Sequence, residues 1–231
     1  MEKYKKNSEF KISSLEVDEC YFKYLFDAIL NVEEKYITYE DLSGHEGKEE
    51  HVERVFAYEL YRQWANLLEK NDEELVLNGE VYKRLNWEPI SCNTEAQGVY
   101  PDLVLHSSQG TGDNQKMICE IKRKANEDKN AIFADFLKLS CYLRDGAFVN
   151  DYASFDYGVF ILAGKDVKLE NIKINDMAKA EKGGQQYNLG KYIEEFHDTL
   201  KRIVCIIYDG NGESLDYDTL DNILGEAETS Q

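Results

Sequence analysis

The segment from Val99 to Asn126 (VYPDLVLHSSQGTGDNQKMICEIKRKAN) places charged residues inside two apolar runs. Asp102 lies in the first run, Glu120 lies in the second, and Lys122 follows two positions later. Unpaired charges in buried strands are unfavourable, so two carboxylates and an ammonium group at these positions need a chemical explanation.

The two runs predict an antiparallel hairpin whose loop, residues 107–115, is rich in Ser, Gly, Asn and Asp. Placing Asp102 opposite Glu120 sets a register in which His106 lies opposite Lys116. Side chains alternate along a strand. One face then carries Asp102, Val104, Ile118, Glu120 and Lys122. The other carries Leu103, Leu105, Met117, Cys119 and Ile121. We therefore expect one apolar core face and one face that presents two acids and a lysine.

Opposed carboxylates on neighbouring strands repel each other, and partial burial strengthens the repulsion unless a cation neutralises them. A hard divalent cation such as Mg²⁺ suits carboxylate ligands. Lys122 would then orient or deprotonate a water molecule, or stabilise the negative charge that develops in phosphodiester hydrolysis. The spacing is equally compatible with a solvated sheet face that carries a Glu-x-Lys surface pair.

A third acid lies on the apolar side of a helix predicted over residues 51–70. This side is formed by Phe56, Leu60, Trp64 and Leu67. Glu53 falls inside the apolar stripe, Glu49 lies close to it one turn upstream, and Glu59 lies at its edge, where water reaches it more easily. A glutamate on a buried face needs a partner, which a metal site on the adjacent sheet would supply. A Lys or Arg partner, or fraying at the helix start, is the alternative.

Together these residues resemble the PD-(D/E)xK nuclease superfamily. Pro101-Asp102 and Glu120-Ile121-Lys122 match its PD…ExK pattern, and Glu53 lies where the superfamily often has a third acid. The resemblance covers about residues 45 to 165 and implies a restriction-endonuclease-like fold.

A further motif lies in the helix predicted after the ExK strand. KLSCY, from Lys138 to Tyr142, resembles the QxxxY motif of one branch of the superfamily, with Lys138 in place of the glutamine. By the resemblance, Lys124, Lys138 and Tyr142 are candidates for substrate contact.

The resemblance also implies roles for the site residues. Asp102 and Glu120 would ligate Mg²⁺ or Mn²⁺, with help from the carbonyl of Ile121, and Lys122 would position the attacking water. Glu53 would complete the site directly or through water, with Glu49 as its alternative. The implied reaction is hydrolysis of a phosphodiester bond in DNA, with RNA as the alternative substrate.

The predicted elements describe an α/β protein with a three-layer α/β/α sandwich around a mixed sheet. Helices are expected over 15–36, 51–70, 130–145 and 188–202. Residues 74–87 are expected to form two short strands or one bent strand, with Asn78-Gly79 as a turn signal. Further strands are expected in the hairpin and over 157–164 and 203–210. This division gives an N-terminal helical extension packed on the core (1–42), a nuclease-like core (43–210) and an acidic C-terminal tail (211–231).

Residues 209–222 (DGNGESLDYDTLDN) have the composition of a calcium-binding loop. Ser214 and Leu220, however, stand where an EF-hand needs Gly and Glu. We therefore expect a turn here, followed by an acidic tail.

Composition limits the partners. Five scattered cysteines favour a reducing compartment, and no apolar run approaches the roughly 20 residues of a membrane span, so we expect a soluble cytoplasmic protein. A net charge of −18 opposes binding to a polyanion, although residues 116–144 carry seven Lys or Arg against four Asp or Glu. A second copy of the chain or another protein would be a further partner. The rival interpretation is an inactive nuclease-like fold that binds nucleic acid or protein, which the acidic charge favours and the complete Asp102, Glu120 and Lys122 set opposes.

Overall fold

The computed structural model describes residues 1–6, 8, 19–37, 49–71, 74–79, 83–84, 98–99, 101–107, 115–123, 128–144, 154–182 and 184–228. The helices are α1 (Glu19–Leu30), α2 (Glu49–Lys70), α3 (Lys129–Tyr142), α4 (Leu189–Leu200) and α5 (Leu220–Glu228), with short 3-10 helices at Glu34–Tyr36 and Leu169–Asn171. The strands are β1 (Glu2–Lys5), β2 (Leu75–Gly79), β3 (Lys83–Arg84), β4 (Gly98–Val99), β5 (Leu103–Ser107), β6 (Gln115–Arg123), β7 (Tyr157–Ala163), β8 (Lys179–Lys182), β9 (Gln185–Asn188), β10 (Ile203–Tyr208) and β11 (Ser214–Thr219).

Seven strands form one mixed sheet in the order β1-β11-β10-β7-β6-β5-β2. The three central strands, β6, β7 and β10, run parallel, and the outer pairs are antiparallel. β7 and β10 are buried on both faces, as their continuous apolar sequences predict. The pairs β3–β4 and β8–β9 form two small separate sheets.

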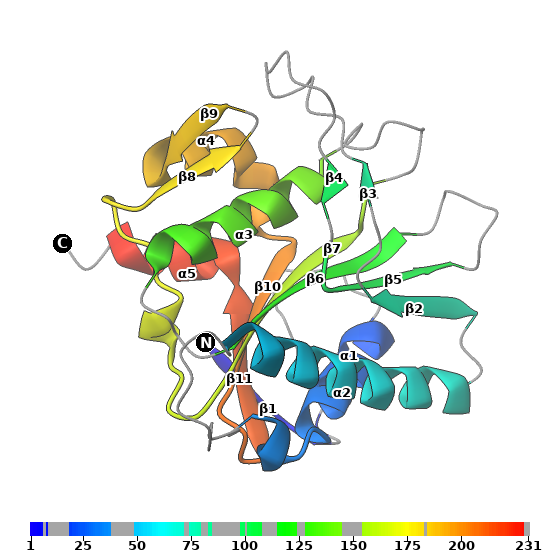
Figure 1. Cartoon of the computed structure of the whole chain (residues 1–231). Coiled ribbons are helices and arrows are strands. Elements are labelled where there is room, and N and C mark those ends of the chain that lie inside the picture. Colours follow the sequence, from blue (N-terminus) through cyan, green and yellow to red (C-terminus); the bar gives the residue numbers. More distant parts are fainter. Residues whose placement is uncertain are drawn as a thin grey trace.

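Helices cover both faces of this sheet (Figure 1). One core packs α1 and α2 against the face that carries Leu105, Cys119 and Ile121. The other packs α3, α4 and α5 against the face that carries Val104 and Ile118. The predicted α/β fold with a mixed central sheet is confirmed, and the arrangement is compatible with a three-layer sandwich.

The hairpin of β5 and β6 has the predicted register from Leu103 opposite Cys119 to Leu105 opposite Met117. Beyond Leu105 the prediction was wrong, because a bulge brings His106 opposite Gln115 instead of Lys116. The predicted alternation of faces is also observed. The face that carries the charged residues is less exposed to solvent than expected, because α3 packs on its apolar residues Val104 and Ile118.

Both ends of the chain differ from the sequence interpretation. The N-terminal segment begins with strand β1, which pairs with β11, before helix α1. Residues 214–228, expected as part of an acidic tail, form β11 and α5, and β11 joins β1 to β10 in the main sheet. The turn expected at Asn78-Gly79 was also wrong, since both residues pair with β5 inside β2.

Two findings concern expectations drawn from composition. No helix in the described ranges is long and apolar enough to cross a membrane. Cys119, Cys141 and Cys205 are buried and carry free thiols.

Candidate active site

Asp102 is held against β6 immediately before β5 begins. Its backbone N–H donates to the carbonyl of Cys119 at 3.2 Å, and its carboxylate Oδ2 accepts from the N–H of Ile121 at 2.6 Å. These two bonds hold Asp102 against β6 just beyond the paired part of the hairpin, where its charge acts on Glu120. Burial raises the pKa of Asp102, and the bond from Ile121 and the ammonium groups of Lys138 and Lys122 oppose the rise.

Glu120 is almost completely buried, with a relative exposure of 2%. Its Oε2 lies 2.5 Å from Nζ of Lys138, and its Oε1 is buried without a hydrogen-bond partner among the described residues. Burial raises the pKa of Glu120 well above its usual value; the charge of Lys138 opposes this rise, and those of Asp102 and Asp135 add to it. The fold therefore keeps a buried carboxylate oxygen that the described groups leave unsatisfied.

Lys122 connects the two layers of helices at the end of β6. Its Nζ lies 3.6 Å from Oε1 of Glu53 on α2 and 3.3 Å from Oδ2 of Asp135 on α3. Burial lowers the pKa of Lys122, but the carboxylates of Asp135, Glu53 and Asp102 outweigh it and raise the pKa above the ordinary value. Lys122 is therefore a stable ammonium group at neutral pH, suited to hold negative charge rather than to remove a proton.

Glu53 reaches the end of β6 from α2. Besides its ion pair with Lys122, its Oε2 accepts from the backbone N–H of Arg123 at 3.4 Å. Burial raises the pKa of Glu53, which Lys122 partly offsets. The structure brings Glu53 near the acids, and its partner is Lys122, the kind of partner that the sequence offered as the alternative to a metal site.

Two predictions about burial along α2 were wrong. Leu68 is buried, whereas Leu67 is only partly buried. Glu59, expected at the solvated edge, is 6% exposed because Arg62 and Gln63 donate to its carboxylate. Its charge is thus satisfied within α2, away from the acids of the hairpin.

Asp135 belongs to the site and was missed from the sequence. It lies one turn before Lys138 on α3, with Oδ1 3.4 Å from Nζ of Lys138. The signal was available, because Asp135 is an acid between the buried residues Phe133 and Phe136. The helical reasoning applied to Glu53 would have selected it.

The remaining predicted residues have different outcomes. Lys138 contacts the acids of the site, as described above. Tyr142 is fully buried with its ring edge-on to Phe155, so it lies in the core and not at a surface that a substrate would reach. Lys124 and the side chain of Glu49 lie outside the described residues. Ile121 is buried in β6, and a role for its carbonyl stays a prediction.

Six charged side chains make up this group, named here the β6 cluster: Glu53, Asp102, Glu120, Lys122, Asp135 and Lys138. Its four carboxylates outnumber its two ammonium groups. Among the described residues, no three Asp, Glu, His or Cys side chains lie close enough together to hold a metal ion by themselves. Mg²⁺, however, is commonly bound by one or two carboxylates and keeps several waters. Asp102 and the unsatisfied Oε1 of Glu120 fit an ion held in this way.

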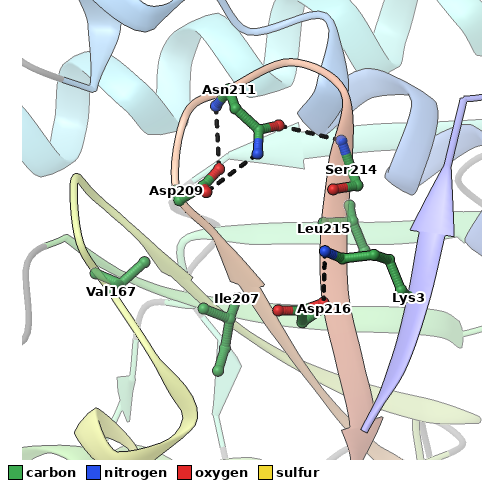
Figure 2. A pocket seen from close by; sticks show the side chains of 8 residues that line it. All are labelled: Lys3, Val167, Ile207, Asp209, Asn211, Ser214, Leu215 and Asp216. Carbon is green, nitrogen blue, oxygen red and sulfur yellow. Dashed lines mark hydrogen bonds and ion pairs between the residues drawn. The ribbon is translucent and has the colours of Figure 1, made fainter.

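A second polar group lies around the turn between β10 and β11 (Figure 2). The pocket there is lined by Lys3, Val167, Ile207, Asp209, Asn211, Ser214, Leu215 and Asp216. Asp209 accepts from the backbone and side-chain N–H groups of Asn211, and Asn211 accepts from the backbone of Ser214. Gly210 and Gly212 have φ angles of 89° and 69°, which favour glycine. Residues 209–213 form the expected turn, whereas strand β11 and helix α5 follow it in place of a tail.

No protein-family model, curated protein or solved structure matches this chain. A function must therefore be inferred from the residues and geometry of the molecule itself.

Proposed function

We propose that the protein is a metal-dependent nuclease with a restriction-endonuclease-like fold, which hydrolyses phosphodiester bonds in DNA at the β6 cluster. The observation that carries the proposal is Oε1 of Glu120, a buried carboxylate oxygen that no described group satisfies, with Asp102 held against the same strand. Buried polar atoms are rarely left unsatisfied, and a bound cation would satisfy this one.

Asp102 and Glu120 are the proposed ligands of Mg²⁺ or Mn²⁺, with the carbonyl of Ile121 as a further ligand. The ion would supply Lewis-acid chemistry and neutralise charge on the phosphate. The N–H of Ile121 fixes Asp102 in place, so this ligand is oriented before the ion arrives.

Lys122 has the proposed role of holding the scissile phosphate and orienting the attacking water. Glu53 and Asp135 support this role from opposite sides, because they keep the side chain charged and directed to the end of β6. Glu53 thereby acts as a positioning residue, in addition to the metal role that the resemblance implies.

The net charge of −18 repels DNA, so positive charge near the site must attract it. Basic residues between 116 and 144, the bound ion, and a second copy of the chain or a partner protein are the proposed sources of attraction. Binding through phosphates is strongly weakened by salt, so cleavage should fall steeply as salt concentration rises. RNA remains the alternative substrate, which the same ion chemistry would hydrolyse.

A second function is favoured by one contact. Lys138 already neutralises one oxygen of Glu120, so an ammonium group could maintain the acid pair in a protein that only binds nucleic acid or another protein. In that case binding would be unaffected by EDTA, and no cleavage would occur with any divalent ion.

The test is cleavage of plasmid, linear and single-stranded DNA, and of RNA, with Mg²⁺, Mn²⁺ or EDTA. Asp102→Asn is the site variant, and Asp216→Asn on strand β11 is the matched control, since Asp216 is half exposed and pairs only loosely with Lys3 at 3.9 Å. The proposal predicts metal-dependent cleavage by the natural protein and by Asp216→Asn, and none by Asp102→Asn. Metal-independent cleavage, or equal cleavage by both variants, would contradict it.

A further inference from the structure

The two carboxylate oxygens of Glu120 are in different environments. Oε2 forms an ion pair with Nζ of Lys138 at 2.5 Å, whereas Oε1 has no hydrogen-bond partner within the described part of the chain. An ammonium group therefore occupies one side of this carboxylate, and on the other side no described group binds Oε1.

Lys138 is held from two directions. Asp135, one turn earlier on α3, lies 3.4 Å from the same Nζ, and the Lys138 side chain is only 18% exposed. The ammonium group thus lies between a carboxylate of the sheet and a carboxylate of the helix, in the kind of position that a second metal ion takes when two ions share a bridging carboxylate. Two-metal sites place their ions about 3.5–4 Å apart, and Mg²⁺ needs oxygen ligands at about 2.0–2.1 Å. A second ion between these carboxylates would overlap Nζ.

We propose that Lys138 takes the place of a second metal ion, so that the β6 cluster binds a single divalent cation through Asp102 and Oε1 of Glu120. This inference rests on the proposed function and specifies the composition of its site. The ammonium group supplies a fixed positive charge beside Glu120. Oε2 of Glu120 is therefore neutralised whether or not a metal ion is bound.

The experiment counts bound Mn²⁺ per chain by equilibrium dialysis and by electron paramagnetic resonance, alongside DNA cleavage. The natural protein should bind one ion. Lys138→Met removes the charge at similar length and frees Oε2 of Glu120 and Oδ1 of Asp135, so it should bind two ions whose spectrum is broadened by their coupling. Lys138→Arg keeps a cation in place and should bind one.

Two ions in the natural protein, or one ion in a folded Lys138→Met variant, would overturn the inference. Circular dichroism shows whether each variant is folded, and Lys138→Gln replaces Lys138→Met if the latter is not. If neither folds, the count in the natural protein and in Lys138→Arg decides. A natural protein that binds one ion and cleaves DNA, beside a folded variant that still binds one, refutes only the inference about Lys138. A natural protein that binds no ion and does not cleave refutes the proposed function as well.

Discussion

The β6 cluster and the turn after β10 both lie at the carboxyl ends of the central strands. They differ in whether their polar groups come from neighbours in the chain or from distant elements. β6, β7 and β10 are parallel and end level with one another, since Arg123 pairs with Ala163 and Ala163 pairs with Tyr208. In the turn, Asp209 and Asn211 are satisfied by bonds to neighbours within a few residues. The β6 cluster instead draws its side chains from α2, β6, α3 and the start of β5.

The two regions also differ in how well their polar groups are satisfied. Bonds within the turn satisfy its polar groups locally, which any chain can do with Asn, Asp and Gly. In the β6 cluster, burial raises the pKa values of Glu53, Asp102 and Glu120, and one oxygen of Glu120 has no hydrogen-bond partner among the described residues. A fold that keeps carboxylates in such surroundings loses stability there, as functional sites often do. The comparison therefore separates a structural turn from a candidate site.

The largest expected effect comes from Glu120→Gln. This change removes a proposed metal ligand while keeping its size. The activation free energy of metal-dependent DNA cleavage should rise by several kcal/mol, so the rate should fall on the order of 10³-fold. Glutamine cannot form the ion pair with Lys138, so the melting temperature without metal should also fall, and cleavage is compared at a temperature where both proteins are folded. Kinetics and calorimetry on the same preparation measure both. A loss of activity that merely follows unfolding would contradict the role proposed for Glu120.

Lys122→Met should have the next largest effect. It removes the group proposed to hold the phosphate and leaves Glu53 and Asp135 without this cation. We expect kcat to fall on the order of 10²-fold and KM to change less. Lys3→Met is the matched control, because the side chain of Lys3 is exposed and forms an exposed pair with Asp216 at 3.9 Å. Its effect on stability should stay below about 1 kcal/mol. Equal loss of activity in both variants would break the distinction between the two regions.

The response to pH should also belong to the β6 cluster. Burial raises the pKa values of Asp102 and Glu120, so both take up protons at higher pH than ordinary carboxyl groups with pKa values of about 4. Mn²⁺ affinity and cleavage should therefore fall with decreasing pH while the protein is still folded.

The same shifts fix the sign of the stability change. A raised carboxyl pKa contributes stability at low pH that is lost as pH rises through the folded-state value. A bound ion reverses this loss, so the rise in melting temperature caused by Mg²⁺ should be larger at pH 8 than at pH 5. Thermal melts at both pH values, with Glu120→Gln as the control, measure it. A Mg²⁺ effect that is independent of pH would contradict the assignment.

The smallest effect is expected from Asp209→Ala in the turn. The variant loses the bonds from Asn211, which should lower the free energy of unfolding by about 1 kcal/mol and leave cleavage unchanged. Urea unfolding and the cleavage assay check the two parts. A clear loss of cleavage in a folded protein would show that the turn belongs to the functional site.

Sequence patterns could predict those parts of the site that depend on neighbours in the chain. Alternation along β5 and β6 identified the face of Glu120 and Lys122, and the helical pattern of α2 identified Glu53. The link from Lys122 to Asp135 depends on how α3 lies across β6, which no local pattern contains. The environment of Lys138 has the same origin, since its partner Glu120 lies on another element.

The ends of the fold were harder to predict for a related reason. β1 has only four residues and pairs with β11 more than 200 positions away, so its strand character comes from a distant partner. β11 alternates acidic and apolar residues as part of SLDYDT, and its acids lie on the less buried positions. Counting acids suggested a tail, whereas the period of two indicates a strand with one buried face.

The most direct test of the central claim is the binding of Mn²⁺ measured by titration calorimetry on the natural protein, Glu120→Gln and Asp216→Asn. We expect saturable binding to the natural protein and to Asp216→Asn, and none to Glu120→Gln. Absence of binding to the folded natural protein, or equal binding to all three, would contradict a metal site at the β6 cluster.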